Sequence, residues 1–474
     1  MEGTLTCSHF TLSHRPAVLT ALLEGLKIEV PTKPNLGVLL RWEDVLGANN
    51  TRSLQVLAVE DGIPLVIHTL VKARNGKRKV GSIVLEVSQS VHQNNIDDWI
   101  KIITYFADPL RPALTELPTL DTITENQPKK RNFMVLINPA SGRGQGEKLF
   151  KKVEPFFVNA NIDVTKVLTQ RAGHATEVAT TLDRSKYDAV VTVGGDGICY
   201  EFIQGLMKRL DWANAIQTPL SVLPAGGGNG LAKSVADNAG EVLTFENSAY
   251  LAVKGRPKPL DLATVRNKTS VSYIFLSLSW AFIAEMDKDS EKYRFMGAQR
   301  FTVAAVAKIM SGKHWSGTFS YIEAREDEAV PSYWESEAAS ADATAPQLSL
   351  LSAAVDSPKP ESWKSIQGDF SMFWALNVAW PAADANFAPT AKLDDGHFHI
   401  VYIPGKATKG EFFNVLTSMD TGSHIEKPCV RVVKTRAFEL QVPETDLIMV
   451  DGEAYQGGLC QVEVHRGLMR ILST

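Results

Sequence analysis

The sequence predicts a mixed α/β chain in which a small mostly-β N-terminal domain precedes a doubly wound α/β domain and an antiparallel β-sandwich. Short β-leaning runs fill residues 26–87, and a helical segment follows them. From residue 132 strands alternate with helices, which is typical of a largely parallel sheet. After residue 260 helices become rare and strand candidates follow one another. The predicted boundaries are residues 1–107 for the N-terminal domain, 108–131 for a linker, 132–260 for the α/β domain and 261–474 for the sandwich.

The composition is that of a globular protein without a strong charge bias. The chain has 474 residues, of which 44% are hydrophobic, and a formal net charge of -4. No nucleic-acid partner is expected, because a phosphate backbone is normally met by a basic surface. The four cysteines form no Cys-x-x-Cys pair, and the N-terminus lacks the basic start and apolar run of a secretory signal. We expect a cytoplasmic protein with peripheral membrane association only, since no segment reaches the ~20 apolar residues of a spanning helix.

The N-terminal domain is predicted to be a β-domain closed by one helix. Residues 93–106 begin with an Asx cap and continue as an amphipathic helix that carries Trp99. This order of elements resembles a pleckstrin-homology-like (PH-like) domain, which implies docking to a phosphoinositide or a protein. The alternative is a small β-domain that only packs against the rest of the chain. Residues 108–130 are rich in Pro and Thr and are expected to form a linker.

Each of the first four strands of the α/β domain is predicted to end in a loop suited to phosphate or ribose contacts. In such sheets ligands bind at the carboxyl ends of the strands. Backbone N–H groups of glycine-rich loops bind anions without a lysine, which matters because the first loop lacks the Lys-Ser/Thr pair of a Walker A motif. The strands and loops are residues 133–137 with 138–146, 164–168 with 169–174, 189–193 with 194–197, and 220–223 with 224–231.

The third of these loops, Gly194-Gly195-Asp196-Gly197, places an acid where a buried strand becomes a helix. Its glycines allow the backbone to approach a ligand closely, and the helix N-terminus directs unpaired N–H groups at the same point. A phosphate group is therefore expected beside Asp196. Taken alone, an Asp in such a turn more often caps the helix than acts in catalysis.

Three motifs, in this order, resemble the catalytic domain of diacylglycerol-kinase-type lipid kinases. They are Asn138-Pro139 with the following SGRGQG, the turn at residues 194–197, and Pro224-Ala225-Gly226-Gly227-Gly228-Asn229-Gly230. More narrowly, residues 169–174, 277–287, 290–300 and 450–453 are similar to the corresponding runs of sphingosine kinases. The resemblance extends over residues 132–472, apart from one insertion.

The resemblance implies an ATP- and magnesium-dependent kinase that phosphorylates the primary hydroxyl of sphingosine or a related sphingoid base, giving sphingosine 1-phosphate. It implies that Asp196 is the base that takes the hydroxyl proton, and that Asp287 meets the amino-alcohol head group. The α/β domain is then the ATP-binding catalytic domain and the sandwich the lipid-binding domain, while metal ligands stay unassigned. The implied ATP contacts are Asn138, Pro139, Ala140, Thr169, His174, Gly194, Glu201, Gly226, Gly227, Gly228, Arg294, Arg300 and Glu453.

Some of these positions depart from the family pattern or allow another role. Gly194 and Gly227 stand where many members have Ser, and Ala140 stands where animal members have Arg, so only backbone contacts to ATP remain there. Arg294 and Arg300 are implied near the phosphates, but surface ion pairing is an equal alternative for both.

Asp287 directly follows a predicted apolar strand, so we expect it at the mouth of whatever that strand lines. From the residues alone, an exposed loop Asp is the more common alternative. A carboxylate at the rim of an apolar cavity suits a ligand with one ammonium and a long chain. A ceramide or diacylglycerol kinase of the same fold is the first alternative, although its substrate has no cation for Asp287. A catalytically idle lipid- or nucleotide-binding protein is the second, which the intact Asp196 and its three loops disfavour.

The sandwich is predicted to contain only two helical segments, residues 298–310 and 409–419. Their apolar side chains are candidate walls for an acyl chain, although core packing is the more common role of such residues. Residues 326–365 are rich in Ala, Ser, Pro and acids and are expected to be a disordered surface insertion. The candidate wall residues are Phe301, Val303, Val306, Ile309, Phe412, Phe413 and Leu416.

Overall fold

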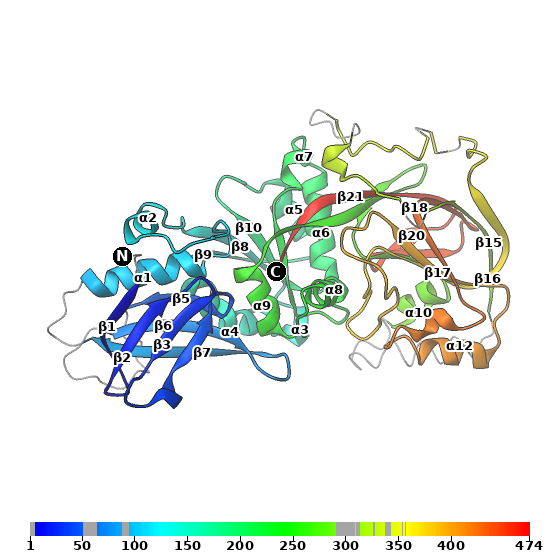
Figure 1. Cartoon of the computed structure of the whole chain (residues 1–474). Coiled ribbons are helices and arrows are strands. Elements are labelled where there is room, and N and C mark those ends of the chain that lie inside the picture. Colours follow the sequence, from blue (N-terminus) through cyan, green and yellow to red (C-terminus); the bar gives the residue numbers. More distant parts are fainter. Residues whose placement is uncertain are drawn as a thin grey trace.

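Figure 1 shows the computed structural model of the chain, in which the N-terminal domain, the α/β domain and the C-terminal β domain lie in a row. The α/β domain occupies the middle, so it contacts both of the others. The structure describes residues 5–50, 64–87, 94–290, 309, 313–325, 328–336, 343–352, 354–355 and 357–474.

The N-terminal domain is an antiparallel seven-stranded sheet closed by helix α1 (Asn94–Ala107). Its strand order is β4-β3-β2-β1-β7-β6-β5. The apolar face of α1 packs into the core of this domain, where the Phe106 ring stacks on Trp42 at a centroid distance of 4.8 Å. The strands are β1 (Thr6–Leu12), β2 (Arg15–Ala21), β3 (Gly25–Glu29), β4 (Val38–Arg41), β5 (Val45–Asn49), β6 (Pro64–Lys72) and β7 (Arg78–Val87), with short 3-10 turns η1 (Pro34–Leu36) and η2 (Trp42–Asp44).

Residues 108–131, which we expected to be a plain linker, contain helix α2 (Leu120–Glu125). The Thr119 hydroxyl caps this helix by accepting a hydrogen bond from the Thr122 amide (3.2 Å). Ile123 is fully buried in the core of the N-terminal domain. The segment is therefore packed onto that domain, and a single capped turn with one buried Ile is too short to show in the composition.

The α/β domain is built on four parallel strands in the order β9-β8-β10-β11. Strand β9 pairs with one edge of β8 and β10 with the other, so the strand order reverses at β8. Open α/β sheets bind their ligands at such a point of reversal. Helix α4 packs with α9, and α5 packs with α6. The elements are β8 (Arg131–Ile137), β9 (Ile162–Leu168), β10 (Ala189–Gly194), β11 (Leu220–Pro224), α3 (Ser141–Gly144), α4 (Gly146–Asn159), α5 (His174–Thr180), α6 (Asp196–Met207), α7 (Trp212–Ala215), α8 (Gly230–Asn238) and α9 (Phe245–Lys254).

The C-terminal domain is mainly antiparallel, and its sandwich-like core is centred on the fully buried Trp280, Phe319 and Phe373. Strand β21 (Leu459–Ser473) joins it to the α/β domain, because β21 pairs antiparallel with β12 and β18 and parallel with β11. The other elements are β12 (Arg256–Arg266), β13 (Val271–Ile274), β14 (Ser277–Ala281), β15 (Trp315–Glu323), β16 (Lys364–Leu376), β17 (Phe398–Pro404), β18 (Arg431–Gln441), β19 (Leu447–Val450), β20 (Glu453–Gln456), α10 (Phe282–Ser290), α12 (Lys409–Leu416), η4 (Tyr333–Glu335) and η5 (Ser423–Glu426).

The single strand predicted at residues 271–283 is divided in the structure into β13 and β14, and helix α10 begins at Phe282. The division has a physical cause, because the backbone amides of Phe275, Leu276 and Ser277 donate to the carboxylate of Asp451. The prediction that Asp287 directly follows a strand is therefore wrong. Asp287 lies on α10.

The described parts of residues 326–365 are packed against the protein, unlike the disordered insertion that we expected. The carboxylate of Glu463 on β21 accepts hydrogen bonds from the amides of Ser349, Leu350 and Leu351. The indole N–H of Trp212 donates to the carbonyl of Ala343 (2.6 Å). The composition could not indicate these long-range contacts, because small and polar residues dominate the segment.

Of the two helices predicted in the C-terminal domain, residues 409–419 correspond to α12, which begins with a capping box between Thr408 and Glu411. The predicted helix at residues 298–310 lies outside the described residues, apart from Ile309. Within the described part of the chain, no helix has the length and apolar character needed to cross a membrane.

Candidate active site

The glycine-rich loops after β8, β10 and β11 touch at one edge of the parallel sheet. A Cβ atom on Gly226 would lie 2.3 Å from the Cα of Gly195 and 2.8 Å from its backbone nitrogen. A Cβ atom on Gly194 would lie 3.4 Å from the Ser141 hydroxyl and 3.6 Å from the Cβ of Asn138. Three of the predicted loops are therefore in direct contact, and the contact between the third and fourth requires glycine.

Asn138 shapes the first loop. Its side-chain Oδ1 accepts a hydrogen bond from the Ala140 amide (3.0 Å), and its carbonyl accepts one from the Ser141 amide (3.1 Å). Pro139 and Ala140 are exposed at the tip of this turn. The loop thus presents backbone to solvent directly beside Gly194.

Asp196 is the first residue of α6, but its carboxylate accepts hydrogen bonds from another helix. Its Oδ2 accepts a hydrogen bond from the Gly230 amide and its Oδ1 one from the Leu231 amide, both at 3.0 Å, at the N-terminus of α8. The alternative that Asp196 caps its own helix is therefore wrong, since α6 has no side-chain cap. Burial raises the pKa of this half-buried carboxyl above its ordinary value, while the amides of Leu231 and Gly230 oppose the rise.

Asn229 closes the fourth loop. It adopts a left-handed conformation (φ 57°), its Oδ1 accepts from the Gly226 amide (2.8 Å), and its Nδ2 donates to the Gly226 carbonyl (2.9 Å). The Gly228 carbonyl accepts from the Ala383 amide of the C-terminal domain (2.9 Å). Gly227 between them is exposed. The loop is thus fixed at both ends, and its exposed middle remains accessible to a ligand.

The second loop is tied to the Asp196 unit through Glu201 on α6. The Glu201 carboxylate accepts a hydrogen bond from the Ala175 amide in the first turn of α5 (3.2 Å). The Nδ1 of His174 accepts from the Gln170 amide (3.1 Å), which closes the loop on itself, and Thr169 is half-buried where β9 ends. In this conformation the Glu201 side chain orders a helix N-terminus.

A second buried acid, Asp451, was not among the predicted site residues. Its carboxylate accepts hydrogen bonds from the amides of Phe275 (3.0 Å), Leu276 (3.0 Å) and Ser277 (2.8 Å). Burial raises the pKa of Asp451 to about 7; the three amides lower it, and the charge of Asp196 raises it further. The two acids therefore face a common space. Asp451 belongs to the run 450–453 that resembles the family, but only Glu453 of that run was predicted to be a site residue.

Glu453 is exposed at the start of β20 and lies near α6. The pKa of Tyr200 on α6 is raised by burial first, and then by the charges of Asp451 and Glu453, whereas a hydrogen bond with Ser272 lowers it. The turn of Asp451 and Glu453 thus lies beside the helix that Asp196 begins.

A cavity of about 450 Å³ lies between the Asp196 loop and the C-terminal domain. Its walls are mainly apolar and come from β14, α10, β16, α12 and β19, with Ile283, Met286, Trp374, Leu416 and Met449 among them. No Lys, Arg or His occurs among its described lining residues. Five carboxylates line it, those of Asp196, Asp287, Asp384, Asp420 and Asp451.

The predicted substrate residue Asp287 is half-buried on α10 and lines this cavity. Of the predicted wall residues, Ile309, Phe413 and Leu416 also line it. Phe412 is instead buried against the Phe282 ring, at a centroid distance of 4.6 Å. Outside the described residues lie Arg294, Arg300, Phe301, Val303 and Val306.

No cluster of three or more His, Cys, Asp or Glu residues in the described part of the chain is placed to hold a metal ion. The charge of Asp196 raises the pKa of Asp451, so these two lining carboxylates lie within electrostatic reach of each other.

Residues 132–265 match the family model of the diacylglycerol kinase catalytic domain, and residues 374–473 match that of the YegS C-terminal NAD kinase beta sandwich-like domain. The chain is also 31% identical over 349 residues to sphingosine kinase 1 from Mus musculus, covering 71% of this chain and 90% of that protein. This chain belongs to the diacylglycerol kinase catalytic domain family. It is a lipid kinase of that family, whose members use ATP.

Similar proteins also occur in other organisms. Sphingosine kinase 1 from Arabidopsis thaliana is 31% identical over 347 residues, covering 71% of this chain and 70% of that protein. Sphingoid long chain base kinase 4 from Schizosaccharomyces pombe is 30% identical over 349 residues, covering 71% and 73%. A solved structure described as a diacylglycerol kinase from Bacillus anthracis shares the fold, with a TM-score of 0.52 and 17% identity over 74% of this chain and 97% of its own.

Proposed function

We propose that this lipid kinase transfers the γ-phosphate of ATP to the primary hydroxyl of sphingosine or a related sphingoid long-chain base. The observation that carries the proposal is the character of the cavity, whose walls are apolar while five carboxylates and no described basic side chain line it. A sphingoid base combines a long hydrocarbon chain with one ammonium group. The names of the relatives from mouse, Arabidopsis and S. pombe support the same class of substrate.

Asp287 is proposed to meet the ammonium group. It extends from α10 into the cavity beside Ile283 and Met286, so a head group near it would place the chain against apolar walls. The summed negative charge of the cavity favours a cation there. The head groups of ceramide and diacylglycerol are neutral and would gain nothing from that charge.

Asp196 is proposed to be the base. Its raised pKa makes the carboxylate more basic than an ordinary Asp, and the Gly230 and Leu231 amides fix its orientation. The substrate oxygen would lose its proton to Asp196 as it bonds to the γ-phosphorus, while the bond from that phosphorus to the β–γ bridging oxygen breaks and ADP leaves.

ATP is proposed to bind along the loop edge of the parallel sheet. Exposed backbone in the first and fourth loops, together with the α6 N-terminus, suits phosphate groups. The Asp451–Glu453 turn borders the same region from the C-terminal domain. The residues proposed for ATP are Asn138, Pro139, Ala140, Thr169, His174, Gly194, Glu201, Gly226, Gly227, Gly228, Arg294, Arg300 and Glu453.

Magnesium is proposed to accompany ATP, where it would neutralise charge on the phosphates. Mg²⁺ usually takes one or two carboxylates together with phosphate oxygens and water. Asp451 would supply one such carboxylate, since it lines the cavity together with Asp196.

The proposal is tested by transfer of labelled phosphate from Mg-ATP to sphingosine, N-acetylsphingosine and diacylglycerol in mixed micelles. N-acetylsphingosine has the same chain without the cation, so we expect only sphingosine to be labelled. Asp196→Asn should lower kcat by about 100-fold or more, because a general base contributes about 10²–10⁴-fold. Asp287→Asn should raise the KM for sphingosine about tenfold, a loss of about 1.4 kcal/mol, and leave the KM for ATP unchanged.

Lys130→Ala is the matched control, because Lys130 forms an exposed ion pair with Asp163 away from the cavity (2.5 Å). Equal labelling of N-acetylsphingosine would show that the head-group argument is wrong. If ATP binds but no lipid is labelled, the chain is an idle scaffold and the proposal fails.

A further inference from the structure

The N-terminal domain lies outside the family's catalytic unit. The match to the diacylglycerol kinase catalytic domain begins at residue 132. The similar Bacillus anthracis structure is covered over 97% of its length by only 74% of this chain. What this added domain does must therefore come from its own contacts with the α/β domain.

The hairpin of β6 and β7 reaches the turn between α8 and α9, where Arg78 forms a buried ion pair. Its Nη2 donates to Glu241 Oε1 and its Nη1 to Asp44 Oδ1, both at 2.8 Å. The guanidinium lies 3.2 Å from the ring centroid of Tyr250 on α9. Arg78 is only 8% exposed and Glu241 7%, so loss of either partner would leave a buried charge.

Asn247, fully buried on α9, completes this contact. Its Oδ1 accepts from the Arg78 amide (2.9 Å), and its Nδ2 donates to Glu241 Oε2 (2.7 Å) and to the Gly76 carbonyl (2.9 Å). Burial lowers the pKa of the Arg78 guanidinium, but its hydrogen bonds and ion pair with Glu241 outweigh this effect. The pKa of Arg78 is therefore raised above its ordinary value. The network is satisfied only while both domains are in place.

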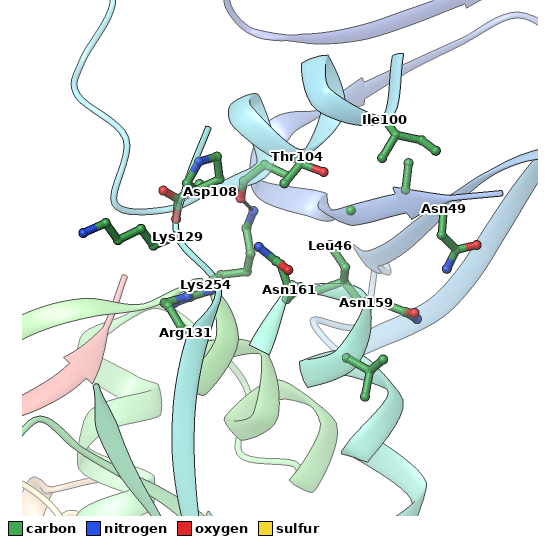
Figure 2. Close-up of a pocket in the computed structure, with 16 residues that line it drawn as sticks. Leu46, Asn49, Ile100, Thr104, Asp108, Lys129, Arg131, Asn159, Asn161 and Lys254 are labelled. Atoms are coloured by element: carbon green, nitrogen blue, oxygen red, sulfur yellow. Dashed lines mark hydrogen bonds between the residues drawn. The ribbon is translucent and has the colours of Figure 1, made fainter. Parts of the chain in front are cut away.

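Lys254 at the end of α9 forms a second anchor, shown in Figure 2. Its Nζ donates to the carbonyls of Val45 (2.9 Å), Trp42 (3.1 Å) and Ala107, all in the N-terminal domain. Beside it, residues of both domains line a cavity of about 200 Å³. Both ends of α9 thus contact the N-terminal domain.

The turn that contains Glu241, the partner of Arg78, follows the C-terminal end of α8. The N-terminal end of the same helix binds the Asp196 carboxylate. Helix α8 has 9 residues and therefore spans about 14 Å. The Gly230 and Leu231 amides at its start hold the Asp196 carboxylate, and Glu241 follows three residues after its end at Asn238. A helix this short moves as a unit, so displacement of the turn displaces the two amides.

We propose that the N-terminal domain is a positioning element for phosphoryl transfer, and that Arg78 acts through Glu241 and α8 to orient the Asp196 carboxylate. Arg78 is thus a positioning residue outside the family's catalytic unit. The proposal rests on the proposed function for the role of Asp196. It assigns the N-terminal domain a fixed intramolecular partner, the turn between α8 and α9, in place of a membrane or protein partner on that face.

The test uses the full chain with Arg78→Met, Arg78→Lys and the control Lys27→Ala. Lys27 forms an exposed ion pair with Glu29 (2.8 Å) on β3, which β2 and β1 separate from β7 in the sheet. Amide hydrogen exchange is measured over residues 226–238, together with kcat and the KM for sphingosine. For Arg78→Met we expect exchange at Gly230 and Leu231 to quicken at least tenfold, kcat to fall about 10- to 100-fold, and that KM to stay unchanged, because the lipid walls belong to another domain.

Arg78→Lys should recover part of kcat, since it keeps the charge but loses the forked geometry, and Lys27→Ala should match the wild type. Wild-type exchange and kcat in folded Arg78→Met would overturn the proposal. So would faster exchange throughout the chain with a parallel rise in the KM, which indicates a purely structural role. If Arg78→Met does not fold, Arg78→Lys and Glu241→Gln are judged by the same criteria. The exchange measurement needs no turnover, so a wrong substrate assignment would leave it valid.

Discussion

Replacing Gly226 with Ala should separate the third and fourth glycine-rich loops. The added Cβ would lie 2.3 Å from the Cα of Gly195, whereas non-bonded carbon atoms pack at about 3.5–4.0 Å. The opposing atoms belong to the backbone, so no side-chain rotation relieves the overlap, and one loop must move by more than about 1 Å. The Gly226 amide, which Asn229 holds at 2.8 Å, would move with it.

Two quantities follow from this displacement. Forcing an extra carbon into a close-packed contact costs about 1–3 kcal/mol, which should appear as a lower urea midpoint of unfolding. A misplacement of about 1 Å in a reaction geometry can cost about 100-fold in rate, so kcat/KM for ATP should fall by that order. The KM for sphingosine should change little, because the C-terminal domain supplies most of the lipid walls.

Substitutions of two neighbouring glycines should have smaller effects. A Cβ on Gly195 would lie 3.2 Å from the Cα of Gly226, and a Cβ on Gly197 would meet nothing within 4 Å. Gly195→Ala should therefore be milder than Gly226→Ala, and Gly197→Ala should raise the free energy of unfolding by up to about 1 kcal/mol through helix propensity. A wild-type urea midpoint and a wild-type kcat/KM for ATP in Gly226→Ala would refute the close-contact explanation.

Two further predictions concern Lys254 and Glu201. Burial lowers the pKa of Lys254 from 10.5 to about 7, so between these values the unfolded state binds the additional proton. The free energy of unfolding of the wild type, relative to Lys254→Met, should therefore rise from pH 7 to pH 9 in urea titrations; a pH-independent difference would contradict this. Glu201→Ala removes the acceptor of the Ala175 amide, and should cost about 1 kcal/mol and speed hydrogen exchange at Ala175. Unchanged exchange there would show that α5 does not depend on Glu201.

The parallel sheet and its loops could be predicted from sequence because their signals are local. The strand before Gly194 is a continuous apolar run that a glycine-dense turn ends, and β10 indeed spans Ala189–Gly194 with every residue buried. The same reasoning identified Asp196, although not its partners. Those partners are amides at the start of α8, which depend on where the fourth strand lies in the sheet.

The features that the sequence did not reveal depend on contacts between distant residues. The break between β13 and β14 requires Asp451, which approaches the 275–277 amides only in the folded chain. Without that break, α10 could not be anticipated and Asp287 was assigned to a strand end. Likewise Asp384 and Asp420 come from loops that carry no motif, and only the fold brings them to the cavity.

Strand β21 has a consequence for how the protein is made. It pairs with β11 of the α/β domain at Ile471, although Leu220 is synthesised far earlier. On a ribosome the N-terminal domain can fold as it emerges, but the edge of the parallel sheet stays open until the whole C-terminal domain has been translated. The half-finished kinase therefore exposes an unpaired strand during synthesis, and in this interval we expect the nascent chain to depend most on chaperones.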